Sequence, residues 1–386
     1  MKRFLAACKT ELNALWRSPW QLALVSYIPL LGVLCLWWLF SAGLPRQLPV
    51  AVVDLDNSQI SRMLTRQLQA NPVVAPVHYV DTRSAVAAMQ QAKVYGLVVL
   101  PADLTRDLLT GHSPTIDIRY NSQFLLVGKL LSSQVQLSMA NGLMQVAGKK
   151  QLLQGVPKAK VAVNLNPVQS QTTALFNRNN NYVGFLVPPV LIALWQLVAM
   201  LVFANSLSRE LASAGEICQG APIWQRIGAK MTVFTPLLML HGGFILLLLY
   251  GYLALPAAGS LALLWGAQWV MLLAVWVLVL LVFFVMRDAA RVVSFGTALF
   301  APAFAFMGVT FPTQEMPQFA QWWRLIMPSS HYIDTHISIV SYGAGWQVWL
   351  LNLGSYWGYL LLLPLLWLLA RKHAPTSSEP HRGAAI

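Results

Sequence analysis

No charged side chain interrupts residues 231–286, which read MTVFTPLLMLHGGFILLLLYGYLALPAAGSLALLWGAQWVMLLAVWVLVLLVFFVM. A membrane-spanning helix needs about 20 apolar residues, so this run is too long for one such helix and long enough for two. Pro256 and Gly259 mark the break between them, because proline lacks a backbone donor and glycine adds backbone entropy. Lipid leaves backbone groups no water to bond, which favours helices. The sequence therefore predicts an integral membrane protein.

Other apolar stretches supply four more helices. The mean hydropathy is +0.57 and charged residues make up 10% of the chain, against about 25% in soluble domains. The first stretch stands alone, a long polar segment follows it, and the other five lie close together. We therefore expect an α-helical polytopic membrane protein with six transmembrane helices in a 1+5 arrangement and an inserted extracytoplasmic domain. The predicted spans are residues 20–39, 183–203, 231–253, 261–286, 292–311 and 348–370.

Basic residues are concentrated in the short segments that flank alternate ends of these spans. The positive-inside rule places such segments in the cytoplasm. We expect both termini, the 206–230 loop and the 372–386 tail to be cytoplasmic, and the large domain to lie outside. That domain is itself basic, but long domains cross the membrane largely regardless of charge. The flanking residues are Lys2, Arg3, Lys9, Arg17, Arg209, Arg226, Lys230, Arg287, Arg291, Arg371 and Lys372.

Residues 1–19 have a pattern of their own. Their apolar side chains fall on one side of a helix, which predicts an amphipathic helix in the cytoplasmic interface. Ser18 and Pro19 predict a bend before the first span, residues 20–44. A cleaved signal peptide is the alternative, but the apolar core is longer than usual for one, which favours a retained anchor. The apolar side chains are Phe4, Leu5, Cys8, Leu12, Leu15 and Trp16.

Residues 45–181 alternate between strand and helix patterns in the order β-α-β-α-β-α-β, which predicts an α/β domain with a small mixed sheet. A long helical stretch follows, at about residues 123–153. Its length of about 45 Å suggests an arm or stalk rather than a helix within a compact domain. One stripe of this helix carries Leu126, Leu130, Leu137 and Met144.

Several segments resemble ABC-2 type transporter permeases. They are VAVVDLDNS at 50–58, YGLVVLP at 95–101, LLTG at 108–111 and PSSHYID at 328–334. Their order and spacing are similar to those of the bacterial ABC exporter membrane subunits that carry a large periplasmic domain. This resemblance implies an inner-membrane permease that pairs as a homo- or heterodimer. It also implies a cytoplasmic ATP-binding subunit and a periplasmic membrane-fusion adaptor as partners.

The resemblance further implies that the loop at residues 206–230 transmits ATP-driven movement to the spans. The residues of this loop that we assign to coupling are Arg209, Glu210, Glu216 and Arg226. The alternative is that these charges only set the topology. The chain itself carries no ATP site. GLMQVAGKK at 142–150 differs from a P-loop in its glycine spacing and lacks Ser or Thr after the lysine.

Ionisable and polar side chains are rare within the spans. Gln196, His241 and Gln268 are candidates for a translocation path, because an intramembrane polar group suggests function. The alternative is a neutral histidine bonded to a carbonyl group. The spans contain no carboxylate, which argues against a proton-driven carrier and favours an apolar or amphipathic cargo.

His331, Asp334 and His336 lie near one another in sequence, but residues five apart do not share one face of a helix. We interpret them as a polar turn at the outer membrane surface rather than a metal site. No catalytic residues, cofactor or nucleic-acid partner are predicted, and membrane lipid is the expected surroundings.

The predicted function is therefore export of a hydrophobic or amphipathic compound by a permease subunit that is powered by a separate ATPase. Two alternatives belong to other classes. A membrane-anchored periplasmic sensor would use the α/β domain to bind a ligand, but five closely packed spans argue against it. A membrane enzyme would need a catalytic constellation, and the sequence shows none.

Overall fold

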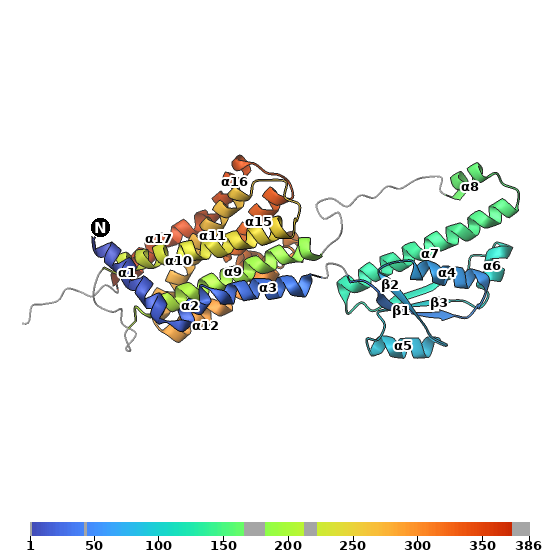
Figure 1. Ribbon diagram of the computed structural model, residues 1–386, viewed down its shortest axis with the longest axis horizontal. Coiled ribbons are helices and arrows are strands. Elements are labelled where there is room, and N and C mark those ends of the chain that lie inside the picture. Colours follow the sequence, from blue (N-terminus) through green and yellow to red (C-terminus); the bar gives the residue numbers. More distant parts are fainter. Residues whose placement is uncertain (1, 42–44, 166–181, 212–221, 373–386) are drawn as a thin grey trace, which may run out of the picture. The chain divides into compact units, whose positions relative to one another are not determined.

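The computed structural model describes residues 2–41, 45–165, 182–211 and 222–372. The chain divides into two compact units (Figure 1). The helical unit comprises Met1–Gly43 and Ala174–Ile386, and the α/β unit comprises Leu44–Thr173.

Six helical segments of the helical unit are long and apolar enough to cross a membrane, as predicted. They are Pro19–Phe40, Val183–Ser208, Ile223–Tyr252, Leu261–Met286, Ala289–Phe306 and Trp346–Lys372. Their helices are α2 (Pro19–Leu24) with α3 (Tyr27–Phe40), α9 (Tyr182–Ser208), α10 (Ile223–Leu246) with the π-helix η1 (Leu247–Tyr252), α11 (Leu261–Met286), α12 (Ala289–Phe300) with α13 (Ala303–Phe306), and α16 (Trp346–Leu353) with η3 (Gly354–Tyr356) and α17 (Trp357–Lys372).

Local sequence explains where these helices begin and end. Ser18 caps α2 by accepting a hydrogen bond from the Gln21 N–H group, and Pro19 occupies the first turn, where its missing donor costs nothing. Arg287 ends α11 in the left-handed conformation, with φ of 49°. Asp288 then caps α12 by accepting from the Arg291 N–H group at 2.8 Å. The Arg287-Asp288 pair thus stops one helix and starts the next.

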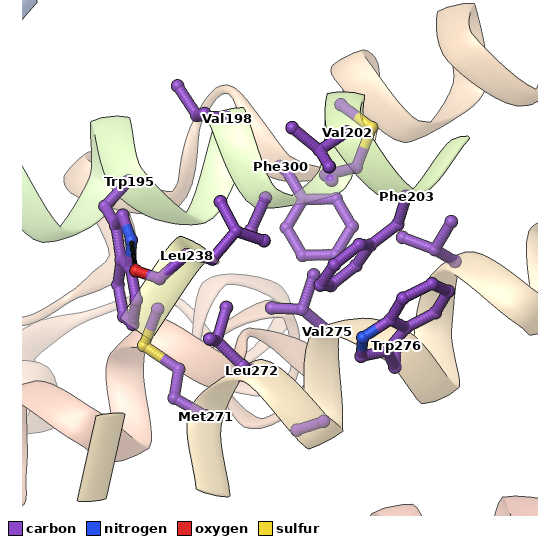
Figure 2. Packing of buried hydrophobic residues seen from close by; sticks show 14 of the residues in the cluster. Trp195, Val198, Val202, Phe203, Leu238, Met271, Leu272, Val275, Trp276 and Phe300 are labelled. Atoms are coloured by element: carbon purple, nitrogen blue, oxygen red, sulfur yellow. Dashed lines mark hydrogen bonds between the residues drawn. The ribbon is translucent and has the colours of Figure 1, made fainter. Parts of the chain in front are cut away.

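Side chains of α9 and α11 form the centre of the helical core, together with residues of α10 and α12 (Figure 2). Phe203 stacks on Trp276, with ring centroids 3.7 Å apart and planes inclined by 17°. The indole N–H group of Trp195 donates to the Leu238 carbonyl oxygen at 3.1 Å. These buried indoles tie α9 to α11 by packing and to α10 by a hydrogen bond, which satisfies the polar atom of a large apolar ring.

Three short elements lie between the last two spans: η2 (Thr313–Glu315), α14 (Gln318–Ile326) and α15 (Pro328–Val340). The prediction of a polar turn around residues 331–336 was wrong. These residues belong to α15, which packs against α11, and both His331 and His336 are 6% exposed. Polar residues in a sequence do not exclude burial, and here His331, Thr335 and His336 each hydrogen-bond to atoms within the unit.

The N-terminal helix α1 (Lys2–Arg17) is separate from α2 and packs against α10. Its buried residues are Glu11 and Leu15. Three members of the predicted apolar face, Leu5, Leu12 and Trp16, remain exposed. One side of α1 is therefore packed on protein, and a second side exposes apolar residues that no described part of the chain covers.

The α/β unit contains a four-stranded mixed sheet in the order β2-β1-β3-β4, which confirms the predicted sheet. The strand β1 pairs in parallel with β2 and β3, and β3 pairs antiparallel with β4. The elements are β1 (Leu48–Asp54), α4 (Gln59–Gln69), β2 (Val74–His78), α5 (Thr82–Gln90), β3 (Gly96–Leu100), α6 (Leu104–Thr110), β4 (Asp117–Tyr120), α7 (Leu125–Leu153) and α8 (Lys158–Leu165).

Helices cover both faces of this sheet (Figure 1). Val50 and Val52 of β1 pack with residues of α4 and α7, whereas Ala51 and Val53 pack with residues of α5. This alternation follows from the two-residue period of a strand. A strand that is buried on both faces reads as a continuous apolar run, which is why 50–53 could be recognised in the sequence.

The long helix α7 is a core helix over its first half rather than a projecting arm. Its residues Leu131, Val135 and Met139 are buried against the sheet and α4. The stripe recognised in the sequence lies elsewhere on the helix, where Leu137 and Met144 are 55% and 46% exposed. Apolar residues are distributed around α7, so its sequence is compatible with more than one apolar stripe. The buried stripe can be identified only from the packing of the helix on the sheet.

Candidate functional site: a buried ion-pair cluster

Five charged side chains from three separate segments meet at the end of α9 and the beginning of α10. We call them the ion-pair cluster: Glu11 of α1, Arg209 and Glu210 just after α9, and Arg226 and Lys230 of α10.

Lys230 is at the centre of the cluster and has no exposed surface. Its Nζ atom donates to Glu11 Oε1 at 2.5 Å and lies 2.9 Å from Glu210 Oε1. The two carboxylates are themselves only 8% and 5% exposed. A fully buried ammonium group is tolerated only when it is paired and hydrogen-bonded, and here it has a carboxylate on each side.

The second oxygen of each carboxylate binds an arginine. Arg209 Nη2 lies 2.5 Å from Glu11 Oε2, and Arg226 Nη1 lies 2.6 Å from Glu210 Oε2. The charges therefore alternate in the order Arg209, Glu11, Lys230, Glu210, Arg226. Each neighbouring pair in this series joins a cation to an anion, so every contact is attractive. The three cations and two anions together carry one net positive charge.

The local structure explains how the cluster is assembled. The α9 helix stops at Ser208, and a tight turn follows in which the Glu210 N–H group donates to the Leu207 carbonyl oxygen at 2.8 Å. On α10, Arg226 and Lys230 are four residues apart and so occupy the same face. That face meets α1, which supplies Glu11.

The energetic consequence of such burial is asymmetric. A complete buried network contributes little net stability, because each charge loses its hydration, but removal of one member leaves a buried charge unpaired at a cost of about 3–5 kcal/mol. The cluster therefore fixes the position of α1 relative to α9 and α10 more than it adds to overall stability. Movement of any one of these segments has to move the others or break ion pairs.

Three of the four residues assigned to coupling from the sequence belong to this cluster: Arg209, Glu210 and Arg226. Glu216 lies outside the residues that the structure describes. Sequence reasoning missed Glu11 and treated Lys230 only as a topology signal. A usable signal was present, since Glu11 follows Cys8 by three residues and precedes Leu15 by four, on the side of α1 that is otherwise apolar.

The three polar residues assigned to a translocation path lie on different helices. Gln196 of α9 accepts from the Ser329 N–H group of α15 at 2.7 Å. Gln268 of α11 donates to the Gly242 carbonyl oxygen of α10 at 3.2 Å. Both side chains are fully buried, and His241 is 8% exposed. The glutamine contacts hold neighbouring helices of one chain together.

His331, Asp334 and His336 have separate partners. His331 Nε2 lies 2.9 Å from the Leu325 carbonyl oxygen, Asp334 pairs with Arg324, and His336 Nε2 bonds to the Tyr250 hydroxyl. No group of three or more His, Cys, Asp or Glu residues that could hold a metal ion occurs in the described part of the chain.

Six apolar helices, a buried charge cluster at one end of two of them and a separate α/β unit define a polytopic membrane protein. The sequence profile described as "ABC-2 family transporter protein" matches residues 19–370. The chain belongs to this family, and the family predicted from the sequence is thereby confirmed. ABC-2 permeases are membrane subunits without an ATP site of their own, and ATP hydrolysis takes place in a separate cytoplasmic subunit.

Individual relatives are distant in sequence. The inner membrane transport permease YhhJ of Escherichia coli is 23% identical over 308 residues, which cover 78% of each protein. ABC transporter G family member 20 of Dictyostelium discoideum is 21% identical over 315 residues, and the match covers 80% of this chain but only 42% of that protein. The linearmycin resistance permease protein LnrN of Bacillus subtilis is 24% identical over 150 residues, 39% of this chain and 38% of LnrN.

Proposed function

We propose that this chain is the membrane subunit of an ATP-driven exporter in the bacterial inner membrane, and that it moves a hydrophobic or amphipathic compound outward. Both termini would lie in the cytoplasm and the α/β unit in the periplasm. A separate cytoplasmic ATP-binding subunit would supply the energy, and a second permease would complete the membrane part.

The observation that carries this proposal is the ion-pair cluster. An ATPase that binds the loop between α9 and α10 would move Arg209 and Glu210, which are anchored through Glu11 and Lys230 to α1 and α10. A movement at the loop would thus reach two helices of the bundle and the N-terminal helix together. Arg226 and Glu216 remain predicted members of this coupling device.

The orientation has support from α1. Leu5, Leu12 and Trp16 are 59%, 46% and 69% exposed, while the side of the helix that carries Glu11 and Leu15 is buried against the bundle, where α1 packs on α10. An exposed apolar stripe on a helix that carries Lys2, Arg3 and Lys9 suits the interface of an anionic cytoplasmic leaflet. We therefore place α1 in that interface.

The nature of the cargo follows from what the spans contain. None of the six described spans includes Asp or Glu, so these spans offer no carboxylate to carry protons or to bind a cationic cargo. LnrN is named for resistance to linearmycin, which supports transport of a compound rather than of an inorganic ion. Gln196, His241 and Gln268 remain predicted translocation-path residues.

The α/β unit supports a periplasmic adaptor as a further partner. The exposed stripe of α7 includes Leu137 and Met144, and Leu152 and Leu153 are 47% and 90% exposed at its end. Exposed apolar residues on a long helix suit contact with another protein. We propose that this side of α7 meets a membrane-fusion adaptor.

The test is isolation of the tagged full-length chain from its native membrane in mild detergent, followed by mass spectrometry of the bound proteins. The intact chain is expected to bring down an ATP-binding subunit. The variant Arg209→Ala/Glu210→Ala/Glu216→Ala should lose it, whereas Asp103→Ala/Arg106→Ala, which removes an exposed ion pair of the α/β unit, should retain it. Absence of an ATP-binding subunit with the intact chain would contradict the proposal.

Two checks separate lost binding from lost folding. The triple variant must elute as the intact chain does in size-exclusion chromatography. Its tryptophan emission must also be unchanged, and this emission reports on the helical unit, because all tryptophans lie outside residues 44–173.

A further inference from the structure

A cavity of about 970 Å³ lies within the helical unit, away from the ion-pair cluster. It is a partly open cavity, lined by the first turns of α9, by η1 and the loop that follows it, by the segment after α13 and by residues from the second half of α15 onward. Its volume is at the upper end of the range for small-molecule sites, about 300–1,000 Å³.

The wall is largely apolar and contains a hydrogen-bonded polar pair, with Ser341 and Tyr342 as further polar residues. Phe185, Leu255 and Ile337 represent the apolar part. Tyr250 Oη and His336 Nε2, which both line the cavity, lie 2.5 Å apart and share a hydrogen bond. None of the described residues that line the cavity is Asp, Glu, Lys or Arg.

The backbone around Tyr250 is unusual. The α10 helix widens at its end into the π-helix η1, which carries Tyr250, and π-helical turns are rare and occur frequently at functional sites. Two residues beyond η1, Ala254 adopts φ of 48°, a conformation that alanine rarely takes. The loop is then fixed to α15, because the Ala258 N–H group donates to the Val340 carbonyl oxygen at 2.9 Å. The backbone thus departs from regular α-helix at the part of the chain that lines the cavity.

We propose that this cavity binds a neutral amphiphile, an apolar molecule with one hydroxyl or carbonyl group, and that the Tyr250–His336 pair anchors that polar group. The two side chains offer a hydroxyl and an imidazole that can accept from or donate to such a group. A charged ligand is disfavoured because no lining residue would neutralise it. Burial lowers the pKa of His336, which lies outside the six spans, to about 4, so the imidazole is neutral at physiological pH.

Binding at this cavity does not depend on the transport activity proposed above, so the test measures binding alone. The full-length chain in phosphatidylcholine nanodiscs is irradiated with a hexadecanol that carries a diazirine, and the labelled peptides are identified by mass spectrometry. Saturable labelling is expected in residues 250–258 and 333–342. The sulfate ester of the same alcohol should compete at least about tenfold more weakly, because its charge has no partner.

Two substitutions, one in the loop after η1 and one in η1 itself, form a matched pair. Ala257→Trp places a large ring at the cavity wall, whereas Leu247→Trp adds the same ring at a side chain that is 68% exposed and does not line the cavity. We expect the first to abolish labelling of these peptides and the second to leave it unchanged. Labelling spread over exposed helix faces, or equal in both variants, would overturn the proposal.

The anchor is tested separately with Tyr250→Phe, which keeps the ring and removes the hydroxyl group. The concentration for half-maximal labelling should rise about fivefold, as expected for loss of one hydrogen bond. An unchanged concentration would overturn the assignment of the anchor. Competition by diacylglycerol added to the nanodisc, compared with competition by water-soluble octanol, distinguishes a lipid ligand from a solute of the same chemistry.

Discussion

Glu11 and Lys230 lie 219 positions apart in the sequence and form a buried ion pair, with 2.5 Å between Glu11 Oε1 and Lys230 Nζ. This contact joins the N-terminal helix to the start of the third span. Both residues are buried, with 8% of Glu11 and 0% of Lys230 exposed. Charge pairing between such distant segments makes the N-terminal helix an integral part of the bundle's end rather than a separate appendage.

Replacement of Glu11 by glutamine should destabilise the helical unit by about 3 kcal/mol, because Lys230 and Arg209 each lose a charged partner in a buried site. The measurement is the midpoint of thermal unfolding in detergent, with tryptophan emission as the signal that monitors unfolding. Lys9→Gln is the matched control, since Lys9 is exposed on the same helix and its substitution should cost less than about 0.5 kcal/mol. Equal midpoints for the two variants would contradict the described network.

The pairing can also be isolated by a double-mutant cycle of Glu11→Gln and Lys230→Met. Because each single substitution leaves the other charge buried, the double variant should be destabilised by less than the sum of the two, with an interaction energy of about 1–3 kcal/mol. Simple additivity would show that the two side chains do not interact in the folded protein.

Gly242 and its neighbour Gly243 offer a sharp comparison within α10. A Cβ atom at Gly242 would lie 2.5 Å from Gln268 Oε1 and 3.0 Å from the Trp195 ring, whereas one at Gly243 would meet Trp265 only at 3.6 Å. We expect Gly242→Ala to destabilise by about 1–3 kcal/mol through overpacking and Gly243→Ala to be near neutral. Thermal unfolding in detergent compares them, and the reverse order would contradict the packing of α10 on α11.

The proposed orientation predicts which side of the membrane each unit faces. In a cysteine-free background, Gln136→Cys on the exposed surface of α7 should react with a membrane-impermeant maleimide once the outer membrane is opened. Lys9→Cys on α1 should react only after the inner membrane is permeabilised as well. Labelling of Lys9→Cys before that step would place the N-terminus outside and reverse the topology.

Asp56 gives the α/β unit a dependence on pH. Partial burial raises the pKa of its carboxyl group, but hydrogen bonds from Ser58 and Thr105 outweigh this effect, and the net pKa lies below its ordinary value of 3.8. The Thr105 hydroxyl donates to Asp56 Oδ2 at 2.6 Å, which links the loop after β1 to α6. A carboxylate with a depressed pKa stabilises the folded state above its unfolded pKa, and this contribution is lost as the pH falls through the folded value.

We therefore expect the segment around Thr105 to lose hydrogen-exchange protection as the pH falls below about 4, after correction for intrinsic exchange. The experiment uses the full-length chain in detergent. In Asp56→Asn, which cannot ionise, the protection of this segment should be lower at pH 6 and should change less between pH 6 and pH 3.5. An identical pH response in both proteins would exclude Asp56 as its source.

The spans and the sheet could be predicted because they depend on composition and short-range pattern. A charge-free run as long as 231–286 is compatible with few structures other than membrane-spanning helices. The short apolar run 50–53 similarly predicts a strand that is buried on both faces. The breaks at Pro256 and Arg287 are also local, since they follow from the backbone preferences and charges of the residues themselves.

The sequence was a poor guide wherever partners are far apart along the chain. The position of Glu11 on the apolar side of α1 suggests burial, but its partners Lys230 and Arg209 are identified only in the folded chain. The histidines of α15 suggest a polar surface turn until the Leu325 carbonyl oxygen and Tyr250 are placed beside them. Side-chain pairing across the bundle therefore cannot be derived from a single stretch of sequence.

The central claim is that the ion-pair cluster couples a separate ATPase to the bundle. The most direct measurement is the rate of ATP hydrolysis by the complex of the chain and its co-isolated ATP-binding subunit, reconstituted in nanodiscs, for the native chain, Glu11→Gln and Lys9→Gln. We predict that Glu11→Gln lowers the rate about tenfold, equivalent to about 1.4 kcal/mol, while the subunit stays bound and Lys9→Gln hydrolyses ATP at the native rate. A native rate in the Glu11→Gln complex would contradict the claim.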